Sequence, residues 1–318
     1  MRDSARLTRP GMRRPTPLGI LLGVDDGLLQ CIPGSPPERG IDGPQITSVD
    51  ARGGLAIAGA PGDGGAWVHA GVAWRRAWSG DVRTVQIGVH ALYLGTGDGR
   101  LLHSIDEGEA WTELEGTRSL RHDGDALPPR PAPPAVTGVV EVRSGLVVAF
   151  EGGGTWFTGD QGASWFRRDE GIDRHVLHLY RHPDVERRLY VTTRSGLYRS
   201  GDEGYTWIQS LTDLDRAWCG SLAVLPGPTD ALVLSLARSA SGVGALFRST
   251  NGGGTWSRVL LEGEDEWARV PAVVRPHELE DVAFVAAGSR LYASHDRGHG
   301  WTCLADGLPL VNAVEASV

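Results

Sequence analysis

The sequence predicts an all-β protein, a seven-bladed β-propeller of four-stranded antiparallel blades, and three observations support this. An eight-residue frame recurs five times, with Ser or Thr first, Asp or Asn third, Gly fifth and Trp eighth. Its third residues, Asp106, Asp160, Asp202, Asn251 and Asp296, are separated by 54, 42, 49 and 45 residues, which is the length of a propeller blade. Short β-branched and aromatic runs alternate with turn residues, and no stretch shows sustained helical periodicity.

The best-formed unit spans 174–218 and shows how one blade is built. Its inner strand is predicted over 175–180, the second over 189–193, the third over 196–200 and the outer strand over 206–210. Gly, Pro, Asp and Ser bound each run, as turns require. The unit therefore predicts a four-stranded antiparallel sheet.

Five further stretches align with this unit. In chain order they are 46–74, 82–111, 136–165, 222–256 and 271–301. The first of them keeps Trp74 but has a shorter hairpin that lacks the Asp. Six blades are thus visible in the sequence.

The seventh blade is predicted to be split between the two ends of the chain. Residues 18–31 look like the second and third strands of a blade, and residues 309–318 look like an inner strand with nothing after it. Joining them in one blade closes the ring and leaves no open sheet edge. The Pro-rich stretch 32–45 gives no clear outer strand for this blade, so six or eight blades stay open as alternatives.

The sequence predicts one domain with a tail before it and an insertion within it. Residues 1–17 are predicted as a disordered basic tail, and residues 18–318 as a single propeller domain. Residues 114–136 form an insertion between the third and fourth blades, and their Pro content excludes a strand. We expect a disordered loop there, with a lid or a docking segment as the alternative.

The recurring box is predicted to build a hairpin rather than to carry out chemistry. Asp202 and Ser200 can accept hydrogen bonds from turn amides, and Gly204 supplies a positive φ. Asn251 replaces the Asp in one copy, which keeps the accepting oxygen and loses the charge, as a turn tolerates and a catalytic carboxylate does not. The Trp residues are predicted to wedge between blades, where burial of one ring stabilises by roughly 4–6 kcal/mol by area. The structural residues of the boxes are Asp106 and Trp111, Asp160 and Trp165, Asp202 and Trp207, Asn251 and Trp256, and Asp296 and Trp301.

The frame Ser-x-Asp-x-Gly-x-Thr-Trp resembles the Asp-box, or bacterial neuraminidase, repeat. The match is complete at 200–207 and has one or two substitutions in each of the other four copies. The resemblance implies a β-propeller of the sialidase-like kind, shared by sialidases, xyloglucan-type hydrolases, sortilin-like receptors and photosystem II assembly factors. The chain looks most similar to the last group. In these families the boxes lie away from the ligand, so the resemblance implies that a ligand meets the opposite face.

The chain lacks a sequence motif that is typical of sialidases. Sialidases carry a Phe/Tyr-Arg-Ile-Pro motif that supplies a substrate-binding arginine, and this chain has no such tetrapeptide; the nearest, over 12–15, lies in the tail. A glycosidase needs two carboxylates, or a Tyr and Glu pair, facing each other across the central mouth. Sequence alone does not place such a pair, and no catalytic residue is assigned.

Composition limits the other function classes. All 31 basic residues are Arg, which excludes mechanisms that need a lysine. The net charge of −8 argues against nucleic acid as a partner. The three cysteines are far apart and imply neither a disulfide nor a zinc site. His175 and His178 lie on opposite faces of a strand and cannot share one ion, so neither a metal nor a cofactor is predicted.

The loops opposite the boxes carry opposite charges on two halves of the ring. The turns between second and third strands hold Asp25, Asp26, Asp63, Asp98 and Glu151 in the first four blades and Arg194, Arg238 and Arg290 in the last three. The links between blades add Arg174, Arg216, Arg269, Trp218 and Trp267. Two interpretations stay open. Either these are solvated turn residues neutralised by acidic neighbours, or the arginines and two exposed Trp rings recognise an anionic group, a peptide or a sugar.

From these features we predict a monomeric, non-enzymatic binding or assembly protein of the cytoplasm. Its partner is expected to be a protein or peptide, with a carbohydrate as a further candidate, bound at the charged rim opposite the boxes. No membrane span is expected, and export is the alternative location because the chain begins with a basic stretch. The alternative function is a glycoside hydrolase with its site in the central mouth.

Overall fold

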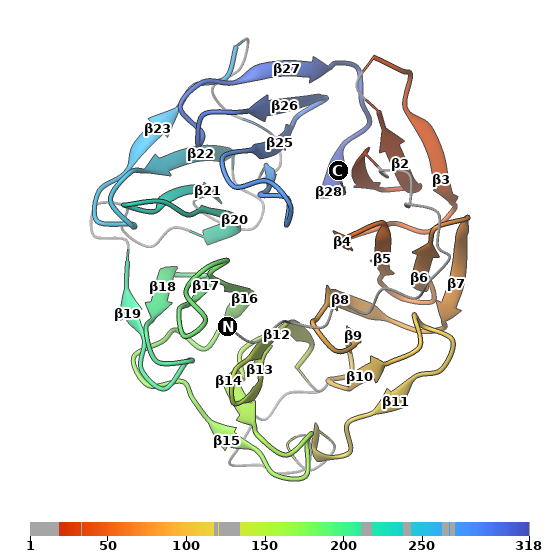
Figure 1. Cartoon of the computed structure of the whole chain (residues 1–318), viewed down its shortest axis with the longest axis vertical. Coiled ribbons are helices and arrows are strands. Elements are labelled where there is room, and N and C mark those ends of the chain that lie inside the picture. Colours follow the sequence, from red (N-terminus) through yellow and green to blue (C-terminus); the bar gives the residue numbers. More distant parts are fainter. Residues whose placement is uncertain are drawn as a thin grey trace, which may run out of the picture.

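The computed structural model describes residues 19–32, 34–117, 120, 134–210, 218–237, 243–262, 267 and 271–317. These residues form seven four-stranded antiparallel sheets arranged as a ring (Figure 1). The prediction of a seven-bladed β-propeller is confirmed. The predicted tail over 1–17 and most of the insertion over 114–136 lie outside the described residues.

The blades follow one another along the chain, and within each blade the strands run in order from the innermost to the outermost. Blade 1 combines β28 (Val311–Ser317) with β1 (Gly19–Val24), β2 (Gly27–Cys31) and β3 (Glu38–Asp42), and blade 2 holds β4 (Ser48–Arg52), β5 (Leu55–Ala60), β6 (Gly65–Ala70) and β7 (Trp74–Trp78). Blade 3 holds β8 (Val82–Ile87), β9 (Leu92–Thr96), β10 (Leu101–Ser104) and β11 (Thr112–Glu113), and blade 4 holds β12 (Val136–Val142), β13 (Gly145–Phe150), β14 (Gly154–Thr158) and β15 (Phe166–Arg167). Blade 5 holds β16 (Val176–Arg181), β17 (Leu189–Thr193), β18 (Gly196–Ser200) and β19 (Ile208–Gln209), and blade 6 holds β20 (Trp218–Leu225), β21 (Ala231–Ala237), β22 (Gly244–Ser249) and β23 (Ser257–Val259). Blade 7 holds β24 (Ala272–Val274), β25 (Ala283–Ala287), β26 (Arg290–Ser294) and β27 (Thr302–Ala305).

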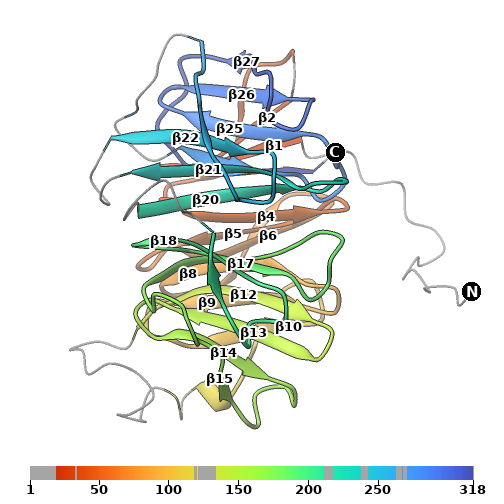
Figure 2. The ribbon, with the colours of Figure 1, turned by 90° about the vertical axis from the view of Figure 1, so that its left-hand side faces the viewer.

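The antiparallel order gives the ring two different faces. The box face carries the loops between first and second strands together with the boxes, which connect third and fourth strands. The link face carries the turns between second and third strands and the links from blade to blade. Figure 2 shows blade 6 from the side, where β20, β21 and β22 run across the thickness of the ring from one face to the other.

Both ends of the described chain meet in blade 1, as predicted. Strand β28 pairs with β1 in antiparallel register, with Ile20 opposite Ala316 and Leu22 opposite Val314. The outer strand β3 lies within the Pro-rich stretch 32–45, where the sequence showed no candidate. Of its five residues, only Gly40 and Ile41 are partly or fully buried. The strand therefore lacks the apolar alternation by which strands are recognised in a sequence.

The hydrophobic core is divided among the seven blade interfaces. Each buried cluster draws its side chains from two neighbouring blades. Between blades 4 and 5, for example, Val147 and Phe157 pack with Leu189, Val191 and Trp207. Every blade is therefore held by its two neighbours.

The boxes form one hairpin geometry five times. In blade 5 the Ser200 hydroxyl donates to Asp202 Oδ1 at 2.7 Å and accepts from the Gly204 amide at 2.8 Å. Asp202 Oδ1 also accepts from the Thr206 amide at 3.0 Å. The same contacts recur at Ser104 and Asp106, Thr158 and Asp160, Ser249 and Asn251, and Ser294 and Asp296. This confirms the predicted role of the boxes as turns.

Each box also places the residue before its Gly in the left-handed region, which the sequence did not indicate. Glu107, Gln161, Glu203 and Arg297 have φ values of 58°, 59°, 60° and 60°, at a cost of about 1–2 kcal/mol each. Two of these side chains reach the preceding blade. Glu203 accepts from the Ser144 hydroxyl at 2.6 Å, and the Arg297 guanidinium donates to the carbonyl oxygen of Thr229 at 2.8 Å. The strained residue thus ties neighbouring blades together.

We expect Trp207→Ala to lower the free energy of unfolding by about 3–5 kcal/mol. The ring is 4% exposed in the cluster between blades 4 and 5, and its Nε1 donates to the Arg168 carbonyl of blade 4 at 2.9 Å. Urea unfolding measures the loss. Ile208→Ala is the matched control, because Ile208 is 67% exposed and its change should stay within about 0.5 kcal/mol. A similar loss of unfolding free energy for both variants would contradict the packing of the Trp207 ring between the two blades.

We expect Asp202→Asn to change stability by less than about 0.5 kcal/mol, because Asn251 already fills the same place in blade 6. Asp202→Ala removes the acceptor for the Thr206 amide and hydroxyl and should cost about 1–2 kcal/mol. Urea unfolding of the two variants at pH 7 gives the comparison. Equal losses for Asn and Ala would show that the charge, rather than the accepting oxygen, stabilises the turn.

Candidate functional site

The described arginines of the predicted rim on the link face, Arg174, Arg194 and Arg290, are each paired with a carboxylate of the protein itself. Arg194 Nη2 lies 2.5 Å from Glu151 Oε1 of the neighbouring blade, and its guanidinium lies 4.9 Å from the ring centre of Trp218. One predicted basic residue therefore neutralises a predicted acidic residue. Arg174 pairs with Asp169 at 2.9 Å, and Arg290 pairs with Asp306 at 3.1 Å.

The prediction of two exposed Trp rings on this rim is wrong for one of them. Trp267 is 2% exposed and packs in the cluster between blades 6 and 7. Its backbone exchanges hydrogen bonds with Gly244, which places the ring inside. Trp218 is half-buried under Arg194. Arg216, Arg238 and Arg269 lie outside the described residues, so their place on the rim stays a prediction.

The central channel is lined by the innermost strands of all seven blades. Its volume is about 460 Å³. Six carboxyl groups line it, those of Asp50, Glu141, Asp184, Glu278, Glu280 and Glu315, against three guanidinium groups, those of Arg52, Arg181 and Arg275. Most of these belong to the ends of inner strands or the loops that follow them, at the box face. None of the predicted rim residues that the structure describes lines the channel.

Asp50 is buried, at 4% exposure, and links three blades. Its Oδ2 accepts from the Ile87 amide at 2.5 Å and from Gln86 Nε2 at 2.6 Å, both on β8. Its Oδ1 lies 3.2 Å from His277 Nε2 of blade 7. These contacts satisfy the hydrogen-bonding capacity of a carboxyl group that is buried.

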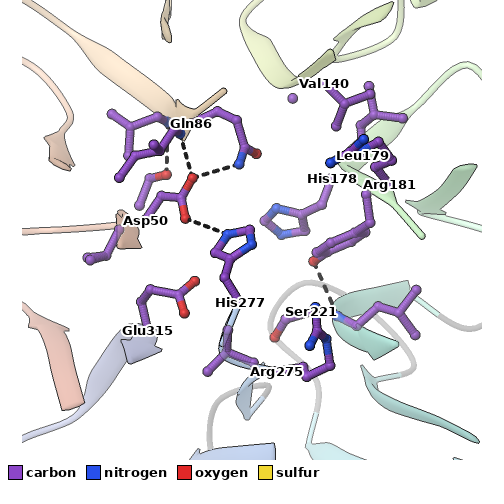
Figure 3. Close-up of a pocket in the computed structure, with 18 of the residues that line it drawn as sticks. Asp50, Gln86, Val140, His178, Leu179, Arg181, Ser221, Arg275, His277 and Glu315 are labelled. Carbon is purple, nitrogen blue, oxygen red and sulfur yellow. Dashed lines mark hydrogen bonds and ion pairs between the residues drawn. The ribbon is translucent and has the colours of Figure 1, made fainter. Parts of the chain in front are cut away.

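Glu315 is the other buried carboxyl group of the channel, at 6% exposure. Oε1 accepts from the adjacent Ala316 amide at 2.9 Å, and Oε2 has no hydrogen-bond partner among the described residues. Burial raises the pKa of Glu315 well above its ordinary value, and the negative charges of Asp50 and Glu278 add to the rise, while Arg275 opposes it. Figure 3 shows Asp50, Glu315, His178 and His277 projecting into the same central space.

His178 adds a neutral acceptor to the channel. Its surface is open to the channel, but the surrounding walls keep it from bulk water, and this desolvation lowers the pKa of His178 to about 4. The imidazole is therefore uncharged at pH 7, and it makes no hydrogen bond to a described residue. The sequence indicated only that His178 lies on a strand and does not share an ion with His175. No group of three or more His, Cys, Asp or Glu side chains among the described residues is placed to hold a metal ion.

A groove of about 980 Å³ continues the channel across the box face, over blades 3, 4 and 5. The two cavities share Val89, Glu141 and Arg181 as lining residues. Glu141 is fully engaged, since it accepts from the Val89 amide at 2.6 Å and from the Tyr93 hydroxyl at 2.9 Å. Desolvation and the Glu141 charge raise the pKa of Tyr93 far above its ordinary value, so the phenol stays a donor.

The groove holds charged and apolar side chains without intramolecular partners. Arg143, Arg181 and Glu186 make no hydrogen bond or ion pair with any described residue. Val89 and Ile105 are 57% and 81% exposed at its edge. His103 Nδ1 is buried there without a partner in the described part of the chain. Such a set of side chains suits a ligand with both apolar and charged groups.

The structural comparisons place this fold among β-propellers of different activities. A glycoside hydrolase family 74 xyloglucanase from Xanthomonas campestris matches with a TM-score of 0.58 and 17% identity over 83% of this chain. This chain spans only 45% of that enzyme. YCF48 bound to a D1 peptide matches with a TM-score of 0.56 and 16% identity, over 86% of this chain and 90% of its own. YCF48 from Cyanidioschyzon merolae gives 0.54 and 15%, over 92% and 94% of the two chains.

The sequence comparisons add no family. No protein-family model and no curated protein matches this chain. At such low identities, the structural likeness establishes the fold alone. Among the described residues, no helix has the length and apolar character needed to cross a membrane.

We expect Glu315→Gln to stabilise the protein at pH 8 and to leave it nearly unchanged at pH 4. Because the folded-state pKa is raised, stability is lost as the pH rises above the unfolded-state pKa, by up to about 1.4 kcal/mol per unit of pKa difference. Melting temperatures between pH 4 and pH 8 measure the effect. Glu38→Gln, at an exposed position of β3, should follow the wild-type curve. A Glu315→Gln protein less stable than wild type at pH 8 would show that Glu315 is ionised and compensated.

Proposed function

We propose that this protein is a non-enzymatic propeller that binds a segment of a partner protein. The observation that carries the proposal is the groove that continues the channel over blades 3 to 5, with unpartnered Arg143, Arg181 and Glu186. Charged groups without internal partners, beside exposed Val89 and Ile105, are typical of a surface that completes its contacts with another molecule. The groove volume of about 980 Å³ lies at the upper end of the roughly 300–1,000 Å³ that ligand pockets have.

This proposal changes the expected contact surface but not the expected kind of partner. The rim of the link face is largely satisfied by its own ion pairs, such as Arg194 with Glu151, whereas the groove is not. Partner binding at the box face also departs from what the Asp-box resemblance implies. We keep membership of the Asp-box repeat family and a cytoplasmic location as parts of the proposal.

The comparisons favour a binding protein over a hydrolase. The chain spans nine-tenths of YCF48, which was solved with a bound peptide, but less than half of the family 74 xyloglucanase. A chain of nearly the same extent as a propeller that was solved with a bound peptide supports a binding role. The hydrolase lacks that support, because more than half of the enzyme has no counterpart in this chain.

A hydrolase is nevertheless the second candidate, because two carboxyl groups project into the channel. Asp50 is held by three donors, whereas the pKa of Glu315 is raised. A raised pKa suits the general acid of a glycosidase, which needs a second carboxyl group beside it. Against it, the two side chains are only 4% and 6% exposed, which leaves little room for a sugar ring to reach both.

We expect peptides selected from a random twelve-residue phage library to bind wild-type protein through the groove. Reversing one charge, by Arg143→Glu or Arg181→Glu, should weaken the selected peptides about ten-fold or more, as loss of an ion pair with a peptide carboxylate predicts. Fluorescence anisotropy of labelled peptides gives the affinities. Melting temperatures of both variants should match wild type, because neither arginine has an internal partner among the described residues to lose.

Arg194→Ala on the link face is the matched control and should leave the peptide affinities unchanged. Peptides that lose affinity with Arg194→Ala but not with the groove variants would move the contact surface back to the rim. Release of reducing sugar from xyloglucan or aryl glycosides, abolished by Asp50→Asn, would replace the binding function by the hydrolase.

A further inference from the structure

We propose that the channel binds a guanidinium or ammonium group between Asp50 and Glu315, supplied by a basic side chain of the bound partner segment. The identity of the donor rests on the proposed function, but the cation site rests on the channel itself.

The side chains that converge in the channel are mainly hydrogen-bond acceptors. In Figure 3 the carboxyl groups of Asp50 and Glu315 and the imidazoles of His178 and His277 face the same space. The carboxyl groups accept hydrogen bonds, and the neutral His178 ring offers one free nitrogen lone pair. Tyr180, whose ring centre lies 6.0 Å from that of His178, already uses its hydroxyl to accept from the Leu222 amide. A ligand rich in N–H donors matches this set.

One acceptor is buried and unused, and this distinguishes the site from a mere acidic cluster. Glu315 is 6% exposed, yet Oε2 has no partner among the described residues and its only hydrogen bond is to the next residue of its own strand. Oε2 is therefore an acceptor without an internal partner on a side chain that is otherwise buried. A donor placed in the channel supplies the partner that it lacks.

The charges around Glu315 favour a cation over an anion. The titratable and charged groups that face it from the packed elements are Asp50 of β4, Asp184 of the β16–β17 loop, Arg275, His277, Glu278 and Glu280 of the segment after β24, and His178 and Arg181 of β16. Arg52 and Glu141 complete the charged lining. Carboxyl groups outnumber guanidinium groups by six to three in the lining of the channel.

Arg275 shows that a guanidinium is tolerated close to this place. The carboxylates of Asp184, Glu315, Glu280 and Glu278 all act to keep it charged, although desolvation lowers its pKa. Its Nη1 donates to the Leu279 carbonyl at 2.9 Å, so part of its hydrogen-bonding capacity is used within its own loop. The remaining excess of carboxyl groups leaves room for a second cation.

The channel is also connected to the surface on which the partner is proposed to lie. Arg181, Val89 and Glu141 line both the channel and the groove. A segment in the groove therefore passes the channel opening, and a long Arg or Lys side chain can enter while its backbone stays outside. The volume of about 460 Å³ accommodates such a side chain.

The test uses N-acetyl-arginine amide as the probe and its neutral isostere N-acetyl-citrulline amide as the matched control ligand. Isothermal titration of the full chain at pH 7 should show the arginine amide binding at least about ten-fold more tightly than the citrulline amide. Glu315→Gln should weaken arginine amide about ten-fold and leave the citrulline amide unchanged. Glu38→Gln, on the outer strand of the same blade, should behave as wild type.

Proton release provides a readout that a purely structural role does not affect. A cation beside Glu315 favours the carboxylate, so binding should release protons, which titrations in phosphate and in Tris detect as different heats. Glu315→Gln should abolish this difference while the protein keeps its fold. Equal binding of the two probes, undetectable binding of the arginine amide, or unchanged proton release in Glu315→Gln would overturn the inference.

The two proposals fail separately. Peptides selected on the groove can be made with each arginine replaced by citrulline or each lysine replaced by its neutral acetylated form. One outcome is that peptides which depend on Arg143 and Arg181 keep their affinity after these replacements. That result would support peptide binding in the groove and would contradict binding of a basic peptide side chain in the channel. Replacing one basic residue of the peptide should weaken its binding to wild-type protein about ten-fold. The same replacement should not weaken its binding to the Glu315→Gln variant, and this pair of results supports the inference.

Discussion

The structure depends on closure of the ring by the pairing of β28 with β1. Each blade buries its faces only against its neighbours, and the buried clusters lie between blades rather than within them. An open ring would expose the apolar faces of two blades and leave inner strands without support. Residues at opposite ends of the chain, such as Ile20 and Ala316, therefore have to meet. This long-range contact fixes the channel, because all seven inner strands are then held around one axis.

The boxes strengthen the same interfaces from one face. Their hydrogen-bonded turns direct each Trp against the preceding blade, as Trp207 shows by donating to the Arg168 carbonyl. The left-handed residue before the Gly adds a second tie, from Glu203 to Ser144 and from Arg297 to Thr229. Backbone strain in the turn is thus offset by contacts between blades. The motif keeps its form in every copy within this chain because each copy solves the same packing problem.

Charge is distributed unequally between the two faces. On the link face, the described arginines that looked like a recognition surface are neutralised by neighbouring carboxylates, as Arg194 is by Glu151. At the box face, the channel and groove hold acceptors and donors whose partners are missing within the described chain, among them Glu315 and Arg181. Unmet hydrogen-bonding capacity is costly in a folded protein, and it is kept where another molecule supplies the complement. This contrast, rather than the amount of charge, indicates the functional face.

The sequence by itself determined the strand order within a blade and the structural role of the boxes, because these follow from local turn chemistry repeated at a fixed period. It favoured seven blades but left six or eight open, and the structure decided the count. It also placed β28 with β1. The C-terminal stretch looks like an inner strand without a blade, and the N-terminal stretch looks like a blade that lacks its inner strand. It missed β3, whose Glu38–Asp42 run lacks apolar alternation, and it misplaced Trp267, which is buried. Only the tertiary structure decided the candidate site. Asp50, Glu315, His178 and Arg275 come from four different blades, and their meeting depends on which side of each inner strand faces the axis, which no local pattern records.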